Sequence, residues 1–270
     1  MKKQIPAYER VKMARDAKRP GALEYIAAIC GDFFEVHGDR AYGDDGAVIC
    51  GIGKLELPDS RELAVSVAAT CRGRTIEERV RRNFGMAQPD GYRKLQRCLA
   101  QAVKFRRPLI TFIDTPGAYP GKSAEERGQG MAIAECLYQM SAAPIPIITV
   151  VIGEGGSGGA IALGVADRII MLENAVLSVL SAEGFASILW KDASRAAEAS
   201  EVMKLTAADL LEHKIADFVI EEPEGGASET PEVVIGRVRD RVRSELGDLL
   251  RLSEAQLLER RYQKYRVIGK

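Results

Sequence analysis

The most informative stretch of the chain is Ile147-Ile148-Thr149-Val150-Val151-Ile152, followed directly by Gly153-Glu154-Gly155-Gly156-Ser157-Gly158-Gly159. The first part is typical of a buried strand, and a short helix of small residues is expected to run from the glycines to about Ala166. Glycine permits positive φ values and close approach of a ligand to bare backbone. A helix start adds unpaired N–H groups and partial positive charge. The stretch therefore predicts an anion-binding turn; the alternative is a tight turn whose glycines serve close packing.

Strands and helices alternate on both sides of this turn, which predicts an α/β fold with helices covering a largely parallel sheet. Further strands are expected at Ala47–Leu57, Glu62–Ala69, Leu109–Ile113, Arg168–Leu172, Val176–Leu180 and Ala216–Ile220. Helical spacing is found from Leu23 through Ile26, Ile29, Cys30 and Phe33, from Asp90 onward, over Ala193–Leu211, and in a basic helix beyond Glu221–Glu232. A capping box at Ser123-Ala124-Glu125-Glu126 predicts a helix that turns Met131, Ala134, Leu137 and Tyr138 inward.

Composition excludes several classes of protein. The 270 residues carry 38 Lys plus Arg and 38 Asp plus Glu, a balance that argues against a main role on nucleic acid or an anionic membrane. No apolar run is long enough to span a membrane, and the N-terminus lacks the apolar core of a secretory signal. The five cysteines have no metal-ligand spacing, so we expect no metal and a cytoplasmic protein. The basic segment Met1–Arg19 predicts either a solvated helical arm or a partner-binding one.

Two nucleotide-binding patterns are present but incomplete. Gly153–Gly158 matches the dinucleotide pattern G-x-G-x-x-G, with Glu173 at the expected distance, yet the helix that follows is short. Asp114–Gly117 and Gly121-Lys122-Ser123 resemble parts of a nucleotide triphosphatase site, but their order and spacing are wrong. Neither pattern supports nucleotide binding on its own.

A serine hydrolase is a third alternative, because Gly155–Gly159 matches the nucleophile pattern G-x-S-x-G. Such an enzyme needs a histidine to take the serine proton. The chain has only His37 and His213, and only His213 follows Ser157 in the hydrolase order. It lies at a polar helix end, where a solvated or capping histidine is expected.

Several further runs together resemble the alpha subunits of bacterial-type acetyl-CoA carboxylase carboxyltransferase. The most specific are Phe112–Gly121 with Ala124–Gln129, and Val151–Ala160. The others are Gly38–Tyr42, Arg81–Met86, Pro89–Lys94, Glu183-Gly184, Ala186–Lys191 and Arg260–Gln263. The resemblance extends in order from about Arg19 to Gly226 and includes the C-terminal tail.

The resemblance implies a crotonase/ClpP-like spiral of ββα units with helical arms at both ends: an N-terminal arm at 1–35, a core at 36–226 and a C-terminal segment at 227–270. It also implies transfer of a carboxyl group from carboxybiotin to acetyl-CoA, giving malonyl-CoA for fatty acid synthesis. Biotin would be carried on biotin carboxyl carrier protein and loaded by biotin carboxylase. The partner would be a zinc-ribbon-containing beta subunit in an α2β2 assembly. Lys204, in Val202-Met203-Lys204-Leu205, is expected to be an ordinary surface lysine and not a biotin carrier.

Site residues follow from the resemblance and from the chemistry. Charge develops on the biotin ureido oxygen when the carboxyl group leaves, so the site needs preorganised N–H donors. The expected backbone donors are Gly158, Gly159 and Ala160; the expected binding residues are Gly117, Ala118, Tyr119, Gly155, Gly156 and Ser157. Arg72, Arg74, Arg81 and Arg82 are candidates for CoA phosphates or a subunit interface, or form an ordinary ion-paired surface.

Two departures from the family pattern bear on the site. Lys122-Ser123 replaces an expected small residue and glycine, and Ala68–Arg72 replaces a Gly-rich, Gln-containing segment. The alternatives that remain are another crotonase-like acyl-CoA enzyme, a serine hydrolase, and a non-catalytic scaffold of the same fold.

Overall fold

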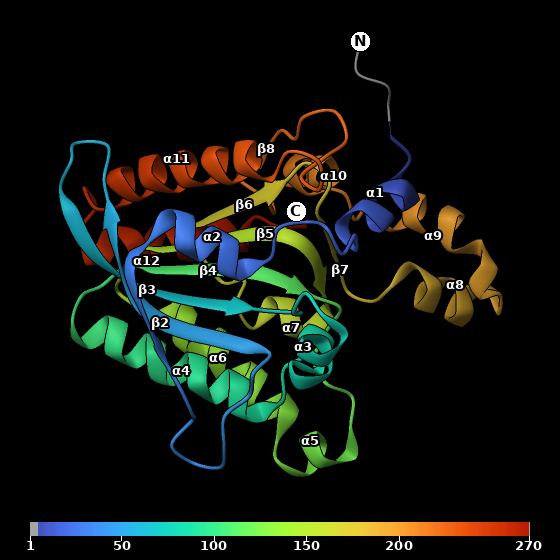
Figure 1. Ribbon diagram of the computed structural model, residues 1–270, viewed down its shortest axis with the longest axis horizontal. Coiled ribbons are helices and arrows are strands. Elements are labelled where there is room, and N and C mark those ends of the chain that lie inside the picture. Colours follow the sequence, from blue (N-terminus) through green and yellow to red (C-terminus); the bar gives the residue numbers. More distant parts are fainter. Residues whose placement is uncertain (1–4, 270) are drawn as a thin grey trace.

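The computed structural model describes residues 5–269 and has one sheet at its centre (Figure 1). The strands are β1 (Gly31–Val36), β2 (Val48–Glu56), β3 (Glu62–Thr70), β4 (Leu109–Thr115), β5 (Ile147–Gly156), β6 (Arg168–Leu172), β7 (Val176–Ser178) and β8 (Phe218–Ile220). Their order in the sheet is β1-β2-β3-β4-β5-β6-β8, and β7 pairs with the end of β5. The pairs β1–β2 and β2–β3 are antiparallel, and the others are parallel. All ten residues of β5 are buried, so the sequence's most apolar run forms the middle of the core.

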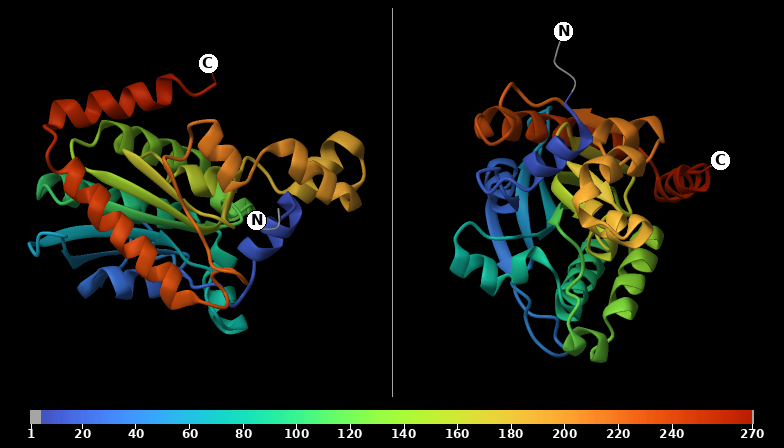
Figure 2. Two further views of the ribbon diagram at one scale, coloured as in Figure 1. Left: turned by 90° about the horizontal axis from the view of Figure 1, so that it is seen from above. Right: turned by 90° about the vertical axis from the view of Figure 1, so that its right-hand side faces the viewer.

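Helices cover both faces of this sheet. They are α1 (Ala7–Ala14), α2 (Ala22–Ile29), α3 (Ile76–Arg81), α4 (Pro89–Lys104), α5 (Lys122–Glu126), α6 (Gln129–Ala142), α7 (Ser157–Ile161), α8 (Ala182–Trp190), α9 (Ala196–Met203), α10 (Ala207–Glu212), α11 (Pro231–Leu249) and α12 (Glu254–Arg266). Figure 1 shows α4 and α6 on one face and α2 and α11 on the other, while α8 and α9 project from the body beside α1. Figure 2 shows the same layers from two further sides. None of the helices within residues 5–269 is both long and apolar enough to cross a membrane.

The predicted strands are confirmed, with differences at their ends. β5 continues to Gly156, because its last residues pair with β7. β7 ends at Ser178 and β8 begins at Phe218, so both are shorter than expected. The prediction of helix through Phe33 is wrong: α2 ends at Ile29, and β1 follows as an edge strand on β2.

The helix expected from Ser123 is two helices, and its predicted inward face is wrong. Gly128, with φ of +81°, separates α5 from α6, and the N-cap of α5 is Gly121 without a side-chain cap. The second helix therefore presents a different face to the sheet from the one expected. The buried residues of α6 are Gln129, Ala132, Cys136 and Met140, whereas Met131 and Tyr138 are 75% and 70% exposed, Ala134 is exposed and Leu137 is half-buried.

The helix predicted over Ala193–Leu211 is also interrupted, and one helix was not predicted. α9 ends at Met203, and the left-handed backbone of Lys204 separates it from α10. The missed helix α8 begins at Ser181, whose hydroxyl accepts a hydrogen bond from Gly184 N–H. This capping signal is present in the sequence.

The basic N-terminal arm is not a solvated extension. Val11 and Ala14 of α1 are buried against Val176 and Leu205. Arg19, beyond the helix, donates to the main-chain oxygen of Ile152 at 2.6 Å and pairs with Glu222. The arm therefore packs on the body and reaches the end of β5.

All five cysteines are buried free thiols: Cys30, Cys50, Cys71, Cys98 and Cys136. They lie on α2, β2, β3, α4 and α6 or directly beside those elements. They fill space in the core and hold no disulfide.

Candidate functional site

A cavity of about 810 Å³ lies where β4 and β5 end, which we call the β4–β5 pocket. One wall is the loop after β4, and the other is the start of α7 with the first turn of α6. The lining residues are Arg15, Arg72, Pro116, Gly117, Ala118, Tyr119, Pro120, Glu125, Gln129, Gly130, Ile133, Glu154, Ser157, Gly158, Val179, Leu180 and Ser181. Ligands in parallel α/β sheets bind at this edge, where strands give way to helix starts.

Glycines at the end of β5 and in α7 allow this part of the chain to contact the end of β4 and the loop after it. A Cβ atom at Gly156 would lie 2.1 Å from Pro116 O, and one at Gly159 would lie 2.6 Å from the carbonyl carbon of Gly117. One at Gly153 would lie 2.5 Å from the Asp114 carboxylate. Close packing therefore explains why Gly153, Gly156 and Gly159 are glycines. For these three positions, the alternative of a tight, closely packed turn is correct.

The start of α7 faces the pocket. The first-turn N–H groups of a helix have no intrahelical acceptor, which in α7, with its N-cap at Gly156, applies to Ser157, Gly158 and Gly159. The predicted donor Ala160 differs, because its N–H is placed to donate to Gly156 O within the helix. Ser157 is exposed and adopts φ of +45°, a left-handed conformation that costs about 1–3 kcal/mol in a non-glycine residue. Ser157 and Gly158, at the start of the helix, both line the pocket.

The hydrolase alternative lacks its base. His213 is exposed beyond α10, and within residues 5–269 no hydrogen bond joins it to Ser157. His37 is exposed and lies 3.1 Å from Asp44. Ser157 therefore has the strained turn of a nucleophile without the histidine that would activate it.

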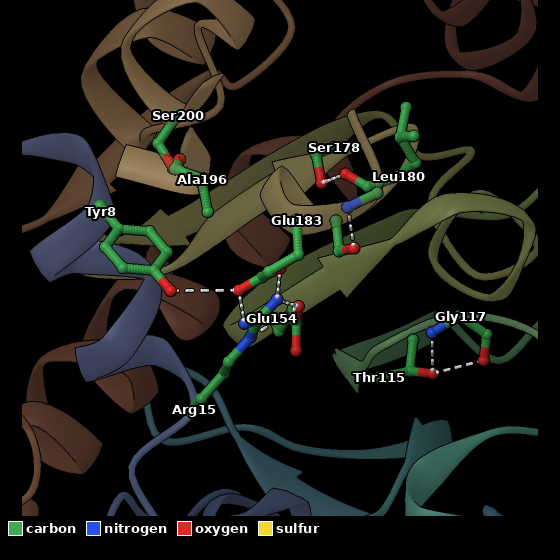
Figure 3. A network of polar contacts seen from close by, with 12 residues as sticks. Tyr8, Arg15, Thr115, Gly117, Glu154, Ser178, Leu180, Glu183, Ala196 and Ser200 are labelled. Carbon is green, nitrogen blue, oxygen red and sulfur yellow. Dashed lines mark hydrogen bonds and ion pairs between the residues drawn. The ribbon is translucent and has the colours of Figure 1, made fainter. Parts of the chain in front are cut away.

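A charged network forms the floor of the pocket, and Figure 3 shows the part around Arg15. Glu154 of β5 accepts hydrogen bonds from Arg15 and Arg72, each at 2.7 Å. Arg15 also contacts Glu183 at 2.9 Å, and Arg72 contacts Asp114 at 3.0 Å. Two guanidinium groups thus face three carboxylates. These residues therefore give the floor no excess of positive charge.

These ion pairs shift the protonation equilibria of their members. Burial disfavours the charged form of Arg15, but its hydrogen bonds to Glu154 and Glu183 more than offset this and raise its pKa. Burial likewise opposes the charge of Arg72, and the nearby Asp114 and Glu154 raise its pKa. Burial raises the pKa of Glu183, while the hydrogen bond from Arg15 brings it below the usual value. Each of these three shifts favours the charged form of Arg15, Arg72 and Glu183 around neutral pH.

Gln129 holds the wall opposite α7. Its side-chain amide donates to Ala87 O at 2.9 Å and to Tyr119 O at 3.0 Å. Tyr119 N–H also donates to Ala87 O at 3.0 Å, and Ala87 pairs with Ala118. The loop Gly117–Tyr119 is therefore fixed by a residue that the sequence reading passed over.

The predicted site residues divide into three groups. Gly117, Ala118, Tyr119, Ser157, Gly158 and Arg72 line the pocket. Gly155, Gly156, Gly159 and Ala160 are buried directly behind its lining. Arg74 pairs with Glu24, Arg82 donates to Gly46 O at 2.7 Å, and Arg81 is exposed; these three lie outside the pocket. The sequence reading missed Arg15, Glu154, Asp114 and Glu183; Glu154, the one charged residue within the glycine run, was the available signal.

An apolar groove of about 580 Å³ adjoins the pocket and shares Ser157, Gly158, Val179 and Leu180 with it. Its other lining residues are Ile161, Leu177, Ser178, Phe185, Met203, Lys204, Leu210, His213 and Ile215. Val179 is 79% exposed. No cluster of three or more His, Cys, Asp or Glu side chains suited to a metal ion occurs within residues 5–269.

The order of the strands, the helices on both faces of the sheet and a pocket at the ends of β4 and β5 are those of a crotonase-type carboxyltransferase fold. Solved structures of this type superimpose on the chain. Transcarboxylase 12S matches with a TM-score of 0.67 and 23% identity over 87% of this chain, which spans 42% of the transcarboxylase chain. The Pseudomonas malonate decarboxylase hetero-tetramer, solved with coenzyme A, gives a TM-score of 0.68 and 18% identity over 91% of this chain and 95% of that one.

Sequence comparison identifies the family of this chain among the carboxyltransferases. The family described as acetyl co-enzyme A carboxylase carboxyltransferase-like matches residues 1–269. The acetyl-coenzyme A carboxylase carboxyl transferase subunit alpha of Clostridium botulinum is 51% identical over 97% of this chain and 94% of its own length. That of Bacillus velezensis is 50% identical over 99% of this chain and 81% of its own length. The chain belongs to the acetyl-CoA carboxylase carboxyltransferase family.

A third relative has a different architecture. The Clostridium tetani protein named acetyl-coenzyme A carboxylase carboxyl transferase subunits beta/alpha is 48% identical over 100% of this chain, which covers 46% of its length. In that protein the two subunits are one polypeptide.

Proposed function

We propose that the chain is the alpha subunit of a carboxyltransferase that moves the carboxyl group of carboxybiotin to acetyl-CoA, giving malonyl-CoA. The observation that carries the proposal is the open first turn of α7 facing the β4–β5 pocket. The N–H groups of Gly158 and Gly159 are the proposed donors to the oxygen on which charge develops, while Ala160, the third residue expected from the sequence, has its N–H directed at Gly156 O within the helix. Removing one such donor from an enzyme costs about 3–4 kcal/mol of transition-state stabilisation.

The pocket suits a visiting ureido ring. Its volume of about 810 Å³ leaves room for the ring beside an acyl thioester. The Gly117–Tyr119 loop would form the wall facing α7, and the paired charges of Arg15, Arg72 and Glu154 would keep the floor rigid. Biotin would arrive on biotin carboxyl carrier protein after loading by biotin carboxylase, in the cytoplasm.

The second substrate points to a partner subunit. Arg81 and Arg82 lie outside the β4–β5 pocket, and Arg74 lines only a small cavity of about 150 Å³ next to it, where Arg15 and Arg72 are already paired with carboxylates. We infer that a zinc-ribbon-containing beta subunit, in an α2β2 assembly, supplies most of the CoA contacts. The fused Clostridium tetani relative supports a close pairing of the two subunits.

The apolar groove is the proposed contact surface for that subunit. It borders the pocket, and its lining residues Ile161 and Val179 are 48% and 79% exposed. Met131 and Tyr138 of α6 are also exposed, at 75% and 70%. Covering this surface would exclude water from the pocket, which strengthens the hydrogen bonds from the α7 amides.

The test is carboxylation of free biotin by malonyl-CoA, the reverse reaction, measured with the purified chain alone, with the beta subunit alone and with both. We expect turnover only when both are present. Robust turnover by the isolated chain would overturn the two-subunit proposal and favour a self-contained acyl-CoA enzyme. Absence of turnover from a stable complex of both chains would overturn the proposed reaction.

A further inference from the structure

Two threonines interrupt the apolar strands beneath α7. Thr111 of β4 and Thr149 of β5 are register partners, and both are fully buried. A hydroxyl buried without a hydrogen bond destabilises the fold, and valine has the same shape without that cost. Their presence in otherwise apolar strands therefore requires a hydrogen-bonding partner.

That partner is the main-chain oxygen of Leu163. Thr111 Oγ1 lies 2.8 Å from it and Thr149 Oγ1 lies 3.0 Å from it, while the two hydroxyl oxygens are 2.8 Å apart. The three oxygens share two protons, and the carbonyl oxygen can only accept. If both hydroxyls donate to Leu163 O, it accepts two hydrogen bonds; if one threonine donates to the other, the second still donates to Leu163 O. Leu163 O therefore accepts at least one hydrogen bond in either case.

Leu163 lies directly after α7, in the turn that ends the helix. The next carbonyl is also held by a side chain: Tyr265 of α12 donates to Gly164 O at 3.1 Å and accepts from Ala166 N–H at 2.8 Å. A five-residue helix is too short to maintain its own geometry. α7 is thus fixed at its start by contact with the Gly117 backbone and at its end by these hydroxyls.

We propose that Thr111 and Thr149 are positioning residues for carboxyl transfer, which act by holding α7 so that its first-turn N–H groups point into the β4–β5 pocket. The inference rests on the proposed role of those N–H groups. Neither threonine lines the pocket, so both act through the helix. Donors displaced by part of an ångström lose much of their effect on a transition state.

The test uses the chain in complex with its beta subunit and the variants Thr111→Val, Thr149→Val and the double variant. Each valine removes one hydroxyl while keeping the side-chain shape. We expect kcat of biotin carboxylation to fall about 10-fold in each single variant and about 100-fold in the double variant, with KM for malonyl-CoA within about twofold of wild type. Thr111→Ser and Thr149→Ser keep the hydroxyl and should keep kcat within about threefold.

Ser200→Ala is the matched control, because the Ser200 hydroxyl is also buried and donates to a main-chain oxygen, that of Ala196, at 2.9 Å. It should lower stability without lowering kcat. Hydrogen exchange supplies a second measurement: the amides of Ala162, Leu163 and Gly164, which donate to Gly158 O, Ala160 O and Ile161 O, should exchange faster in the valine variants and at the wild-type rate in Ser200→Ala.

Wild-type kcat and unchanged exchange in the valine variants would overturn the inference. An equal loss of kcat in the serine variants would also overturn it, because the hydroxyls would then not be the cause. If the double variant does not fold, the single variants decide, since each retains one hydroxyl on Leu163 O. If the wild-type complex shows no transfer, the proposed function fails, and the exchange measurement still decides whether the threonines hold α7.

Discussion

One added methyl group at Gly159 should slow carboxyl transfer more than it weakens the fold. In Gly159→Ala the new Cβ atom would lie 2.6 Å from Gly117 C, 2.8 Å from Gly117 O and 3.0 Å from Ala118 N. Ordinary contacts of such an atom begin at 3.4 Å. α7 and the facing loop must therefore separate by about 0.8 Å, the difference between 3.4 and 2.6 Å. Every atom in contact is backbone, so no side-chain rotation can relieve the clash.

This separation gives the expected magnitudes. Overpacking of this kind costs about 1–3 kcal/mol, which a domain with a stability of about 5–15 kcal/mol survives. A displacement approaching 1 Å between donors and the reacting group costs about 100-fold in rate. The assay is biotin carboxylation by malonyl-CoA in the presence of the beta subunit, paired with urea unfolding of the same samples.

Two variants control for the glycine substitution itself. At Gly236 of α11 an added Cβ atom meets nothing within 4 Å, so Gly236→Ala should keep the wild-type rate and gain about 0.5–1 kcal/mol of stability. At Gly158 the new atom would lie 3.1 Å from the end of the Ile133 side chain, which can rotate away, so Gly158→Ala should lose less than about 10-fold in kcat. A wild-type kcat in Gly159→Ala, together with lowered stability, would refute the argument that the position of α7 limits transfer.

Three further predictions test other parts of the structure. Ser157→Ala should change kcat by less than about threefold, since no histidine activates the hydroxyl; a loss of several thousandfold in an intact complex would restore the hydrolase alternative. Arg261→Met should lower the free energy of unfolding in urea by about 3–5 kcal/mol. Buried Arg261 donates to three main-chain oxygens and to both oxygens of Asp167, and the variant leaves the Asp167 carboxylate without this partner. A loss below about 1 kcal/mol would contradict this prediction. Burial raises the pKa of Glu222, but hydrogen bonds from Arg19 and Asn174 bring this pKa below its ordinary 4.5. The ionised Glu222 therefore stabilises the fold above pH 4.5, and this contribution is lost as the pH falls through the lowered pKa of the folded state. Glu222→Gln should therefore be less stable at about pH 7 and lose less stability than wild type between about pH 5 and pH 3; an unchanged pH dependence would count against the pairing.

Continuous apolar runs and the glycine turn were enough to predict the parallel part of the sheet. The strands around Ile147–Ile152 are buried on both faces, so their signal does not depend on a partner far along the chain. The face of α6 could not be predicted in the same way. Its register depends on the left-handed turn at Gly128, and one residue of shift moves every side chain by about 100° around the helix.

The site was predictable only where it is local in sequence. The turn from β5 into α7 and the Gly117–Tyr119 loop were found because each is a short, unusual run. Arg15 was not, since it reaches Glu154 across 139 positions of sequence from an arm that resembled a solvated helix. The close packing of Gly156 and Gly159 could not be predicted either, because the backbone that they contact belongs to the loop after β4, about 40 residues earlier in the chain.

The five buried cysteines can be used to measure local unfolding of the chain. Burial raises the pKa of the Cys30 and Cys136 thiols to about 12, so neither is a thiolate in the folded protein. An alkylating reagent needs both access and a thiolate. Labelling of each cysteine, followed by mass spectrometry, therefore measures how often the surrounding element is exposed. Because the five residues are spread over α2, β2, β3, α4 and α6, the unmodified sequence already carries probes across both layers of helices and the sheet between them.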